Sequence, residues 1–436
     1  MPSTEAQNVN LFAQVFNGIQ NALGKDVNLQ INLTPQTFNY PVAPIGSMDP
    51  SVYQFVSTMP KYSPMGTFSN LDAKFFDSYG QVLSHVKFEV SPDKQAALNS
   101  LRDQWTKAQN EVTQMNSNIN LAYQTAKQSG GEVFAAQYPD VTSWLTNDPV
   151  GVGMTKQKAD LQKAASQQGQ LYTDMLAAEA PQSYQAALNA MKMPSGSPTG
   201  PTVRGWTRVN DASGVPQWQP EYVVGNTGQD WRAELTKGSQ GAMSIEIDAS
   251  KTDSKFNKTW ANGSSSYGNF FWGVEGSGGW SELNISQDDS SLKCTIKCES
   301  STLVNVNPGA WYDSGLMRNL GQGAGQGYTL SDGFSVKGPQ PQAFGQDGVL
   351  PTRIAQILVV YKPSFKITCS TSTYKKYEKT ITGGGGLRIG PFHFGGHGGS
   401  HTENVVTGNG SNTFESASTS EVPLILGVTV AFPGLE

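Results

Sequence analysis

Apolar residues between Ser91 and Gly131 recur at alternating spacings of three and four, and this repeat restricts the possible folds more than any other feature. It runs unbroken through Leu98, Leu101, Trp105, Ala108, Val112, Met115, Ile119, Ala122 and Ala126. A heptad pattern of this length predicts a long helix that packs lengthwise on a partner helix. Ser91 and Pro92 suit the start of that helix, and Gly130 and Gly131 suit its end.

The partner helix is expected within the same chain. A similar spacing recurs between Lys156 and Ala180, just before Pro181, at Leu161, Ala164, Gln168, Leu171, Met175 and Ala178. We therefore predict an antiparallel coiled-coil hairpin over about residues 91–180, with a coiled coil between two chains as the alternative. One apolar face between Val9 and Leu23 predicts a further helix of the same bundle.

A Pro-, Gly- and Ser-rich stretch, PSGSPTGPTV at residues 194–203, predicts a linker between two domains. Composition changes there, because 10 of the 47 glycines precede residue 194 and seven of the nine tryptophans follow it. The sequence thus predicts a helical domain over residues 1–193 and a β-rich domain over residues 204–436. Two domains also suit a chain of 436 residues.

Strands are expected in the second half because apolar residues alternate there with polar ones. In SLKCTIKCES the apolar positions are Leu292, Cys294, Ile296 and Cys298, and AMSIEID follows the same period. RIAQILVVY and EVPLILGVTVAF are typical of more deeply buried strands. The fold class expected is α+β and multidomain, with an antiparallel β-sandwich or barrel-like domain after the helical bundle.

Charge and composition argue against several classes of function. The formal net charge is −5 and basic residues are not clustered, so no nucleic-acid partner is expected. The N-terminal segment does not resemble a secretory signal, and no apolar run is long enough for a transmembrane helix. These features predict synthesis in the cytosol, with non-classical release left open. An odd count of three cysteines argues against a disulfide framework and favours buried thiols.

Familiar catalytic and cofactor motifs are not found in the sequence. The run GQGAGQG at residues 321–327 does not have the spacing of a dinucleotide or phosphate loop, and there is no G-x-S-x-G or H-E-x-x-H. The sequence therefore predicts a protein that is not an enzyme and that takes no cofactor.

The stretch GGGGLRIGPFHFGGHGGSH, residues 383–401, holds three of the four histidines in the chain. Its glycines and Pro391 exclude a helix, so His393, His397 and His401 would share a metal ion only if a loop gathered them. The flanking Ser/Thr-rich segments instead predict a long hairpin arm over about residues 364–420 with this stretch at its end. The tip residues expected to contact a membrane or a partner are Leu387, Ile389, Phe392, His393, Phe394, His397 and His401.

A second contact surface is predicted in the aromatic run SSSYGNFFWGVEGSGGW, residues 264–280. Its candidates are Tyr267, Phe270, Phe271, Trp272 and Trp280. Aromatic side chains among Gly and Ser suit contacts with sugars or proteins, although alternating core and surface positions of a strand explain them equally well.

The leading hypothesis is a non-enzymatic interaction protein that engages a membrane or cell surface through the arm, in the manner of a pore-forming or toxin-like protein. The first alternative is a self-assembling structural protein that forms homo-oligomers or a lattice. A surface glycan-binding protein is the third. Membranes, cell surfaces and other copies of the chain are the partners expected.

Overall fold

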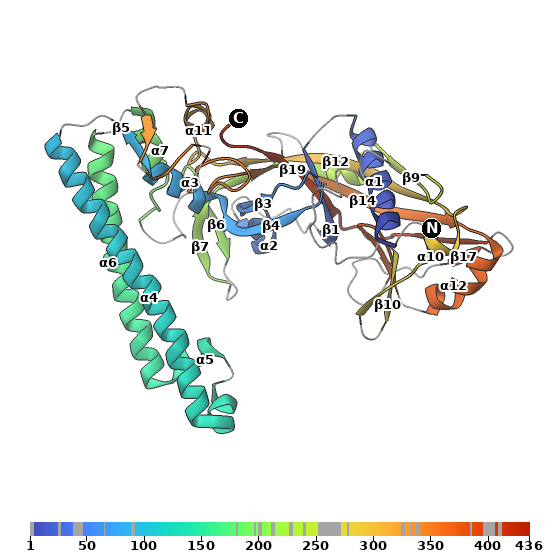
Figure 1. The fold of residues 1–436 in the computed structure, drawn as a ribbon, viewed down its shortest axis with the longest axis horizontal. Coiled ribbons are helices and arrows are strands. Elements are labelled where there is room, and N and C mark those ends of the chain that lie inside the picture. The colour runs from blue at the N-terminus through green and yellow to red at the C-terminus, as the bar shows by residue number, and fades with distance from the viewer. Residues whose placement is uncertain are drawn as a thin grey trace. The chain divides into compact units, whose positions relative to one another are not determined.

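The structure is a computed structural model of the 436-residue chain (Figure 1). It describes residues 4–24, 28–37, 47–64, 66–88, 92–138, 140–179, 182–195, 198, 203–210, 214–225, 230–238, 241–251, 272–276, 279–323, 328–331, 333–336, 338, 341–383, 386–395, 406–408 and 412–436. Helices and antiparallel sheets together make it a mixed α+β protein, which confirms the predicted class.

The chain forms two compact units. The β-rich unit comprises Met1–Val86, Met193–Gly325 and Leu330–Glu436, and the helical unit comprises Lys87–Lys192 and Gln326–Thr329. The boundary was predicted at residues 194–203, and the longer segment of the helical unit ends at Lys192. The assignment of residues 1–86 to the helical domain is wrong, because strand β1 (Leu29–Thr37) pairs with strand β19 (Leu424–Ala431) of the β-rich unit.

Two long helices dominate the helical unit. Helix α4 (Pro92–Gln137) and helix α6 (Pro149–Glu179) pack against each other, with α5 (Val141–Asn147) against α6 and then α7 (Gln182–Ala190) (Figure 1). All nine positions of the predicted apolar repeat in α4 are buried or half-buried. The predicted stop also agrees with the structure, since Gly131 has a φ of 58° and α4 bends there.

The contact face of α6 differs from the prediction at two positions. Ala165 and Tyr172 are buried, whereas Ala164 and Leu171 are exposed. The Tyr172 ring lies 5.6 Å from the Trp105 ring, between centroids, and this pair fixes which side of α6 faces α4. An aromatic pair buries more apolar area than a leucine and an alanine would, so it decides the rotation of the helix.

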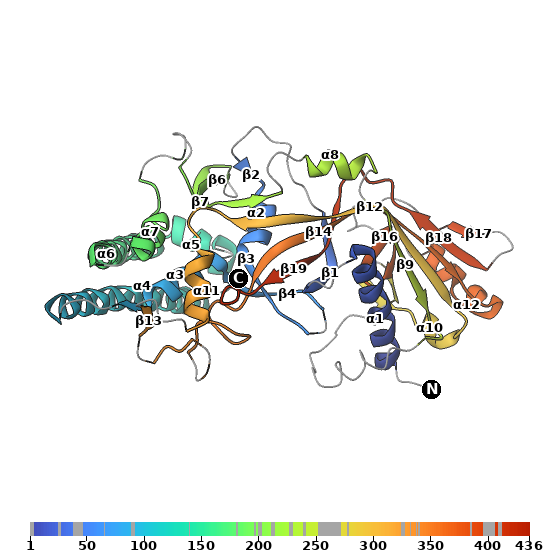
Figure 2. The ribbon, with the colours of Figure 1, turned by 90° about the horizontal axis from the view of Figure 1, so that it is seen from above.

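The β-rich unit is organised on two long antiparallel strands, β12 (Lys293–Pro308) and β14 (Arg353–Thr368). At one end of this pair, β8 (Tyr222–Val224) joins β12, β19 joins β14, and β1 joins β19. At the other end, β9 (Met243–Asp248) joins β12, β18 (Thr413–Ala417) joins β14, and β17 (Val406–Gly408) joins β18 (Figure 2). Each long strand thus pairs with different strands at its two ends.

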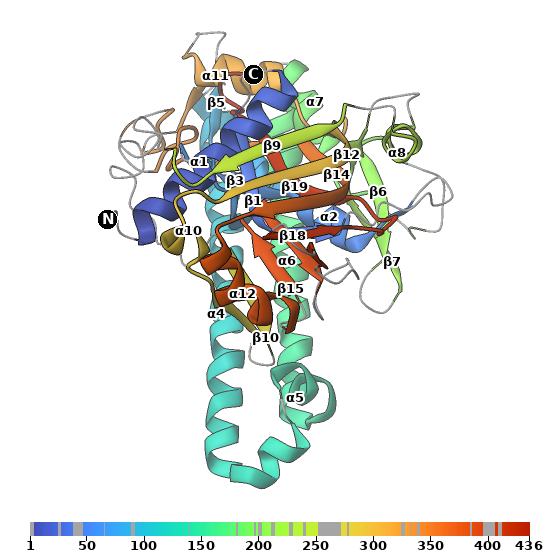
Figure 3. The ribbon, with the colours of Figure 1, turned by 90° about the vertical axis from the view of Figure 1, so that its right-hand side faces the viewer.

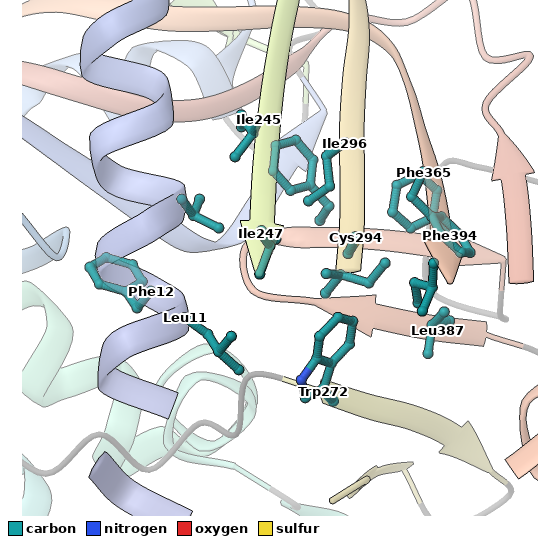
Figure 4. Close-up of a cluster of buried hydrophobic side chains, with 14 of the residues drawn as sticks. Leu11, Phe12, Ile245, Ile247, Trp272, Cys294, Ile296, Phe365, Leu387 and Phe394 are labelled. Atoms are coloured by element: carbon teal, nitrogen blue, oxygen red, sulfur yellow. The ribbon is translucent and has the colours of Figure 1, made fainter. Parts of the chain in front are cut away.

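A second sheet covers the β9–β12–β14 end. Its order is β11 (Gly279–Glu282), β10 (Trp272–Gly276), β15 (Gly386–Ile389) and β16 (Phe392–Gly395). Figure 4 shows side chains of both sheets meeting in one apolar core, among them Cys294, Ile296 and Trp272. The Phe365 and Phe394 ring centroids are 4.5 Å apart across this core. None of the sheets formed by the described strands is closed, so the barrel-like alternative is not supported.

Helix α1 (Thr4–Leu23) belongs to the β-rich unit and lies on strand β9 (Figures 3 and 4). Leu11, Phe12, Val15 and Ile19 are buried in the same apolar core. Gln14 fixes the contact, because its Nε2 donates to the Asp248 carbonyl at 3.0 Å and its Oε1 accepts from the Asp248 N–H at 2.7 Å. The prediction of a further bundle helix was therefore wrong: the apolar face was read correctly, but its partner is a sheet.

Shorter elements complete the fold. In the N-terminal segment these are β2 (Ser47–Met48), α2 (Pro50–Ser57), β3 (Thr58–Lys61), β4 (Ser69–Lys74), α3 (Phe75–Ser84) and β5 (Val86–Phe88). After the helical unit come β6 (Trp206–Asn210), β7 (Pro216–Pro220), α8 (Trp231–Thr236), α10 (Ile285–Asp288), α11 (Ser314–Gly321), β13 (Tyr328–Leu330) and α12 (Thr371–Gly383).

Helix α12 occupies the place predicted for one side of a hairpin arm. Strand β14 ends at Thr368, and α12 follows it beside α10 (Figure 3). Two carboxylates at the end of α10 hold this helix: Asp288 accepts from Lys376 Nζ at 2.8 Å and from the Tyr377 hydroxyl, and Asp289 accepts from the Ser370 N–H. The arm predicted over residues 364–420 is therefore wrong, since the described residues of this segment form the end of β14, helix α12 and strands β15 to β18, which pair within the sheets of the β-rich unit.

Asp289 is expected to make the stability of the β-rich unit depend on pH. Burial acts to raise the pKa of this carboxyl, but hydrogen bonds from Ser291 and Ser370 outweigh it and lower the pKa to about 2. A lowered pKa stabilises the fold above the unfolded value of about 3.9, and the contribution is lost as pH falls toward 2. Asp289→Asn should therefore lower the free energy of unfolding by about 2 kcal/mol at pH 7 and by much less at pH 2. Urea titrations at both pH values measure this.

The exposed Asp72 supplies the control for that experiment. Asp72→Asn should leave the free energy of unfolding unchanged within about 0.5 kcal/mol at both pH values. An equal loss for Asp289→Asn at pH 7 and pH 2 would contradict the role given to its charge.

The three thiols are expected to be unreactive in the folded protein. Cys294, Cys298 and Cys369 are free and buried, as the alternation of β12 predicted for the first two. Burial raises the pKa of all three, to about 12 for Cys298 and about 11 for Cys369. Because the thiolate is the reactive form, a chromogenic disulfide reagent at pH 8 should label none of them in buffer and all three in urea. Rapid labelling of any thiol in buffer would contradict this burial.

Candidate ligand-binding site

The apolar residues predicted to form an exposed tip lie inside the core. Leu387 and Ile389 on β15 are 0 % exposed, and Phe392 and Phe394 on β16 are 1 % exposed. They pack against the long strands because β15 and β16 belong to the second sheet. The expectation that these four side chains project toward a membrane or a partner is wrong for this conformation.

The histidines of the same stretch are not brought together by the described part of the chain. His393 is half-buried on β16, opposite Arg388 of β15 in the strand register. His397 and His401 lie outside the described residues. Among the residues that are described, no group of three or more His, Cys, Asp or Glu side chains is placed to hold a metal ion.

The predicted aromatic surface is likewise not assembled. Trp272 is 1 % exposed and belongs to the core, where it packs beneath the β9–β12 strands (Figure 4). Trp280 lies on β11 opposite Glu275, and its side chain is outside the description. Tyr267, Phe270 and Phe271 are also outside the described residues. For Trp272 the core position is the correct reading of the two that the sequence left open.

A membrane-spanning helix is not found in the described part of the chain, because no helix there is both long enough and apolar enough.

An aromatic cavity lies elsewhere in the β-rich unit, where the β6–β7 hairpin covers helices α2 and α3. Five rings contribute to its wall: Tyr53, Phe76, Trp206, Trp218 and Tyr222. We call this space the aromatic cavity. Its volume is about 150 Å³.

The hairpin places its two tryptophans on one face. In the antiparallel register Trp206 lies opposite Pro220, and Arg208 lies opposite Trp218. Residues two apart on a strand share a face, so Trp206 and Arg208 point the same way, as do Trp218 and Pro220. The Arg208 guanidinium carbon lies 5.6 Å from the centre of the Trp218 ring and stacks on it. This contact fixes the ring that lines the cavity.

The helices supply the opposite wall. The Phe76 ring of α3 meets Trp206 edge to face, with ring centroids 5.6 Å apart. Tyr53 of α2 meets Tyr222 in the same manner at 5.9 Å. Edge-to-face pairs of this kind are favourable contacts between aromatic rings, so these four rings support one another in the wall.

Polar groups stand at defined places around these rings. The buried Trp218 indole N–H has no hydrogen-bond partner among the described residues, although an indole N–H usually finds one when it is buried. Asp77, in the first turn of α3, and Lys74, just before that helix, supply a carboxylate and an ammonium group. Gln219 of β7 adds an amide.

The aromatic surroundings alter the acid–base behaviour of the cavity. Burial raises the pKa of Asp77, although Lys74 opposes the shift. Burial also raises the pKa of Tyr53, and the charge of Asp77 adds to that effect. The two groups therefore lie close enough to interact. Ser57 also lines the cavity, and its hydroxyl donates to the Gln54 carbonyl at 3.3 Å.

This site was not predicted from the sequence, although the pattern of its hairpin can be recognised there. The stretch GWTRVNDASGVPQWQPEYV alternates aromatic and polar residues on both sides of a turn, which is the pattern of a hairpin with one aromatic face. Tyr53 and Asp77 could not have been added to it, because nothing local links them to a hairpin that follows them by more than 120 residues.

The chain was compared with protein-family models, curated proteins and solved structures, and none of them matches it.

Proposed function

We propose that the protein is a non-enzymatic interaction protein whose β-rich unit recognises a small ligand in the aromatic cavity. The observation that supports this proposal is the cavity itself, where five aromatic rings and the charged groups of Lys74 and Asp77 line one space of about 150 Å³. Convergent polar groups on an aromatic wall are typical of ligand sites.

This proposal replaces membrane contact through the glycine-rich stretch as the leading function. Membrane insertion needs an exposed apolar surface, and Leu387, Ile389, Phe392 and Phe394 are buried. The non-enzymatic class remains part of the proposal.

A screen of small polar and aromatic fragments by ligand-observed NMR tests the proposal. We expect hits whose signals are lost with Asp77→Arg, because the long side chain fills the mouth and reverses its charge. Asp72→Arg is the matched control, since Asp72 is an exposed acid that does not line the cavity, and it should retain the hits. Hits that survive Asp77→Arg, no hits at all, or chemical turnover of a hit would each contradict the proposal.

Self-association through the helical unit is a second candidate function. Five apolar side chains of that unit are exposed, at Leu121, Val133, Val150, Val152 and Leu171. Exposed apolar residues on a helix pair favour packing against another copy. Sedimentation equilibrium should then show oligomers that weaken with Leu121→Ser and Leu171→Ser. A monomer at every concentration would remove this candidate.

We also propose two finer features of the fold from the packing of the described residues. Burial of the α4 repeat and the Trp105–Tyr172 contact support an antiparallel coiled-coil hairpin within the helical unit. The shared core between the β9–β12–β14 strands and the four-stranded sheet supports a sandwich-like packing in the β-rich unit.

A further inference from the structure

We draw no further inference here: the strongest candidate, the surface of helices α4 and α6 that exposes Leu121, Val133, Val150, Val152 and Leu171, carries nothing beyond the self-association already proposed, because nothing in the described part of the chain shows what covers these side chains.

Discussion

Phe394→Ala is expected to lower the free energy of unfolding of the β-rich unit by about 3–5 kcal/mol. The side chain is 1 % exposed, and its ring centroid lies 4.5 Å from that of Phe365 in β14. Removal of the ring would lose its buried apolar area and leave a cavity between the two sheets. Urea denaturation followed by tryptophan fluorescence measures the change, because seven of the nine tryptophans follow residue 194.

The same substitution separates two readings of the glycine-rich stretch. On a projecting tip, Phe394 would contribute almost nothing to stability, and its replacement would change the free energy of unfolding by less than about 0.5 kcal/mol. Leu435→Ala provides a matched control, since Leu435 is apolar and 63 % exposed in the same unit. Equal small effects at both positions would show that the second sheet does not cover the core as described.

Gly427→Ala is expected to cost about 3 kcal/mol, at the upper end of the usual penalty for overpacking. Gly427 lies on β19, where a Cβ atom would come within 2.5 Å of the Gln30 carbonyl oxygen and 3.2 Å of the Ile31 Cα. Both are backbone atoms of β1, so no side-chain rotation can relieve the contact. Strand β1 would have to separate from β19, and its hydrogen bonds would be lost.

Gly241→Ala is the control for that prediction. No atom lies within 4 Å of the Cβ that this substitution would add, and the backbone does not adopt a left-handed φ there. Alanine should therefore be neutral, or stabilise by up to about 1 kcal/mol through the unfolded state. Thermal and urea unfolding of the two variants compare a crowded glycine with an open one, and a neutral Gly427→Ala would contradict the close approach of β1 to β19.

Local patterns predicted local structure well. The α4 repeat and the alternation of Leu292, Cys294, Ile296 and Cys298 have the burial that the sequence indicates, and α4 bends at Gly131, where its end was predicted. Such patterns reflect which side of a helix or strand is apolar, and that side is fixed by the period of the backbone. They say nothing of which element lies against it.

The failures all concern a partner distant in sequence. The apolar face of α1 was recognised but assigned to the wrong partner, because a sheet and a helix bundle both accept it. Phe392 and Phe394 read as an exposed tip because glycine and histidine surround them, yet the long strands cover them. The cavity joins Tyr53 and Asp77 to Trp218, and only the folded chain brings these residues together.

The pairing of Leu29 with Thr429 bears on how the protein is made, because 400 residues separate the two partners. At about 5–20 residues per second on a ribosome, strand β1 waits roughly 20–80 s for the strand it pairs with. The helical segment between residues 87 and 192 emerges during that wait and can fold from contacts within itself. During that time β1 has no strand to pair with, and unpaired strand edges are the part of a nascent chain most exposed to aggregation.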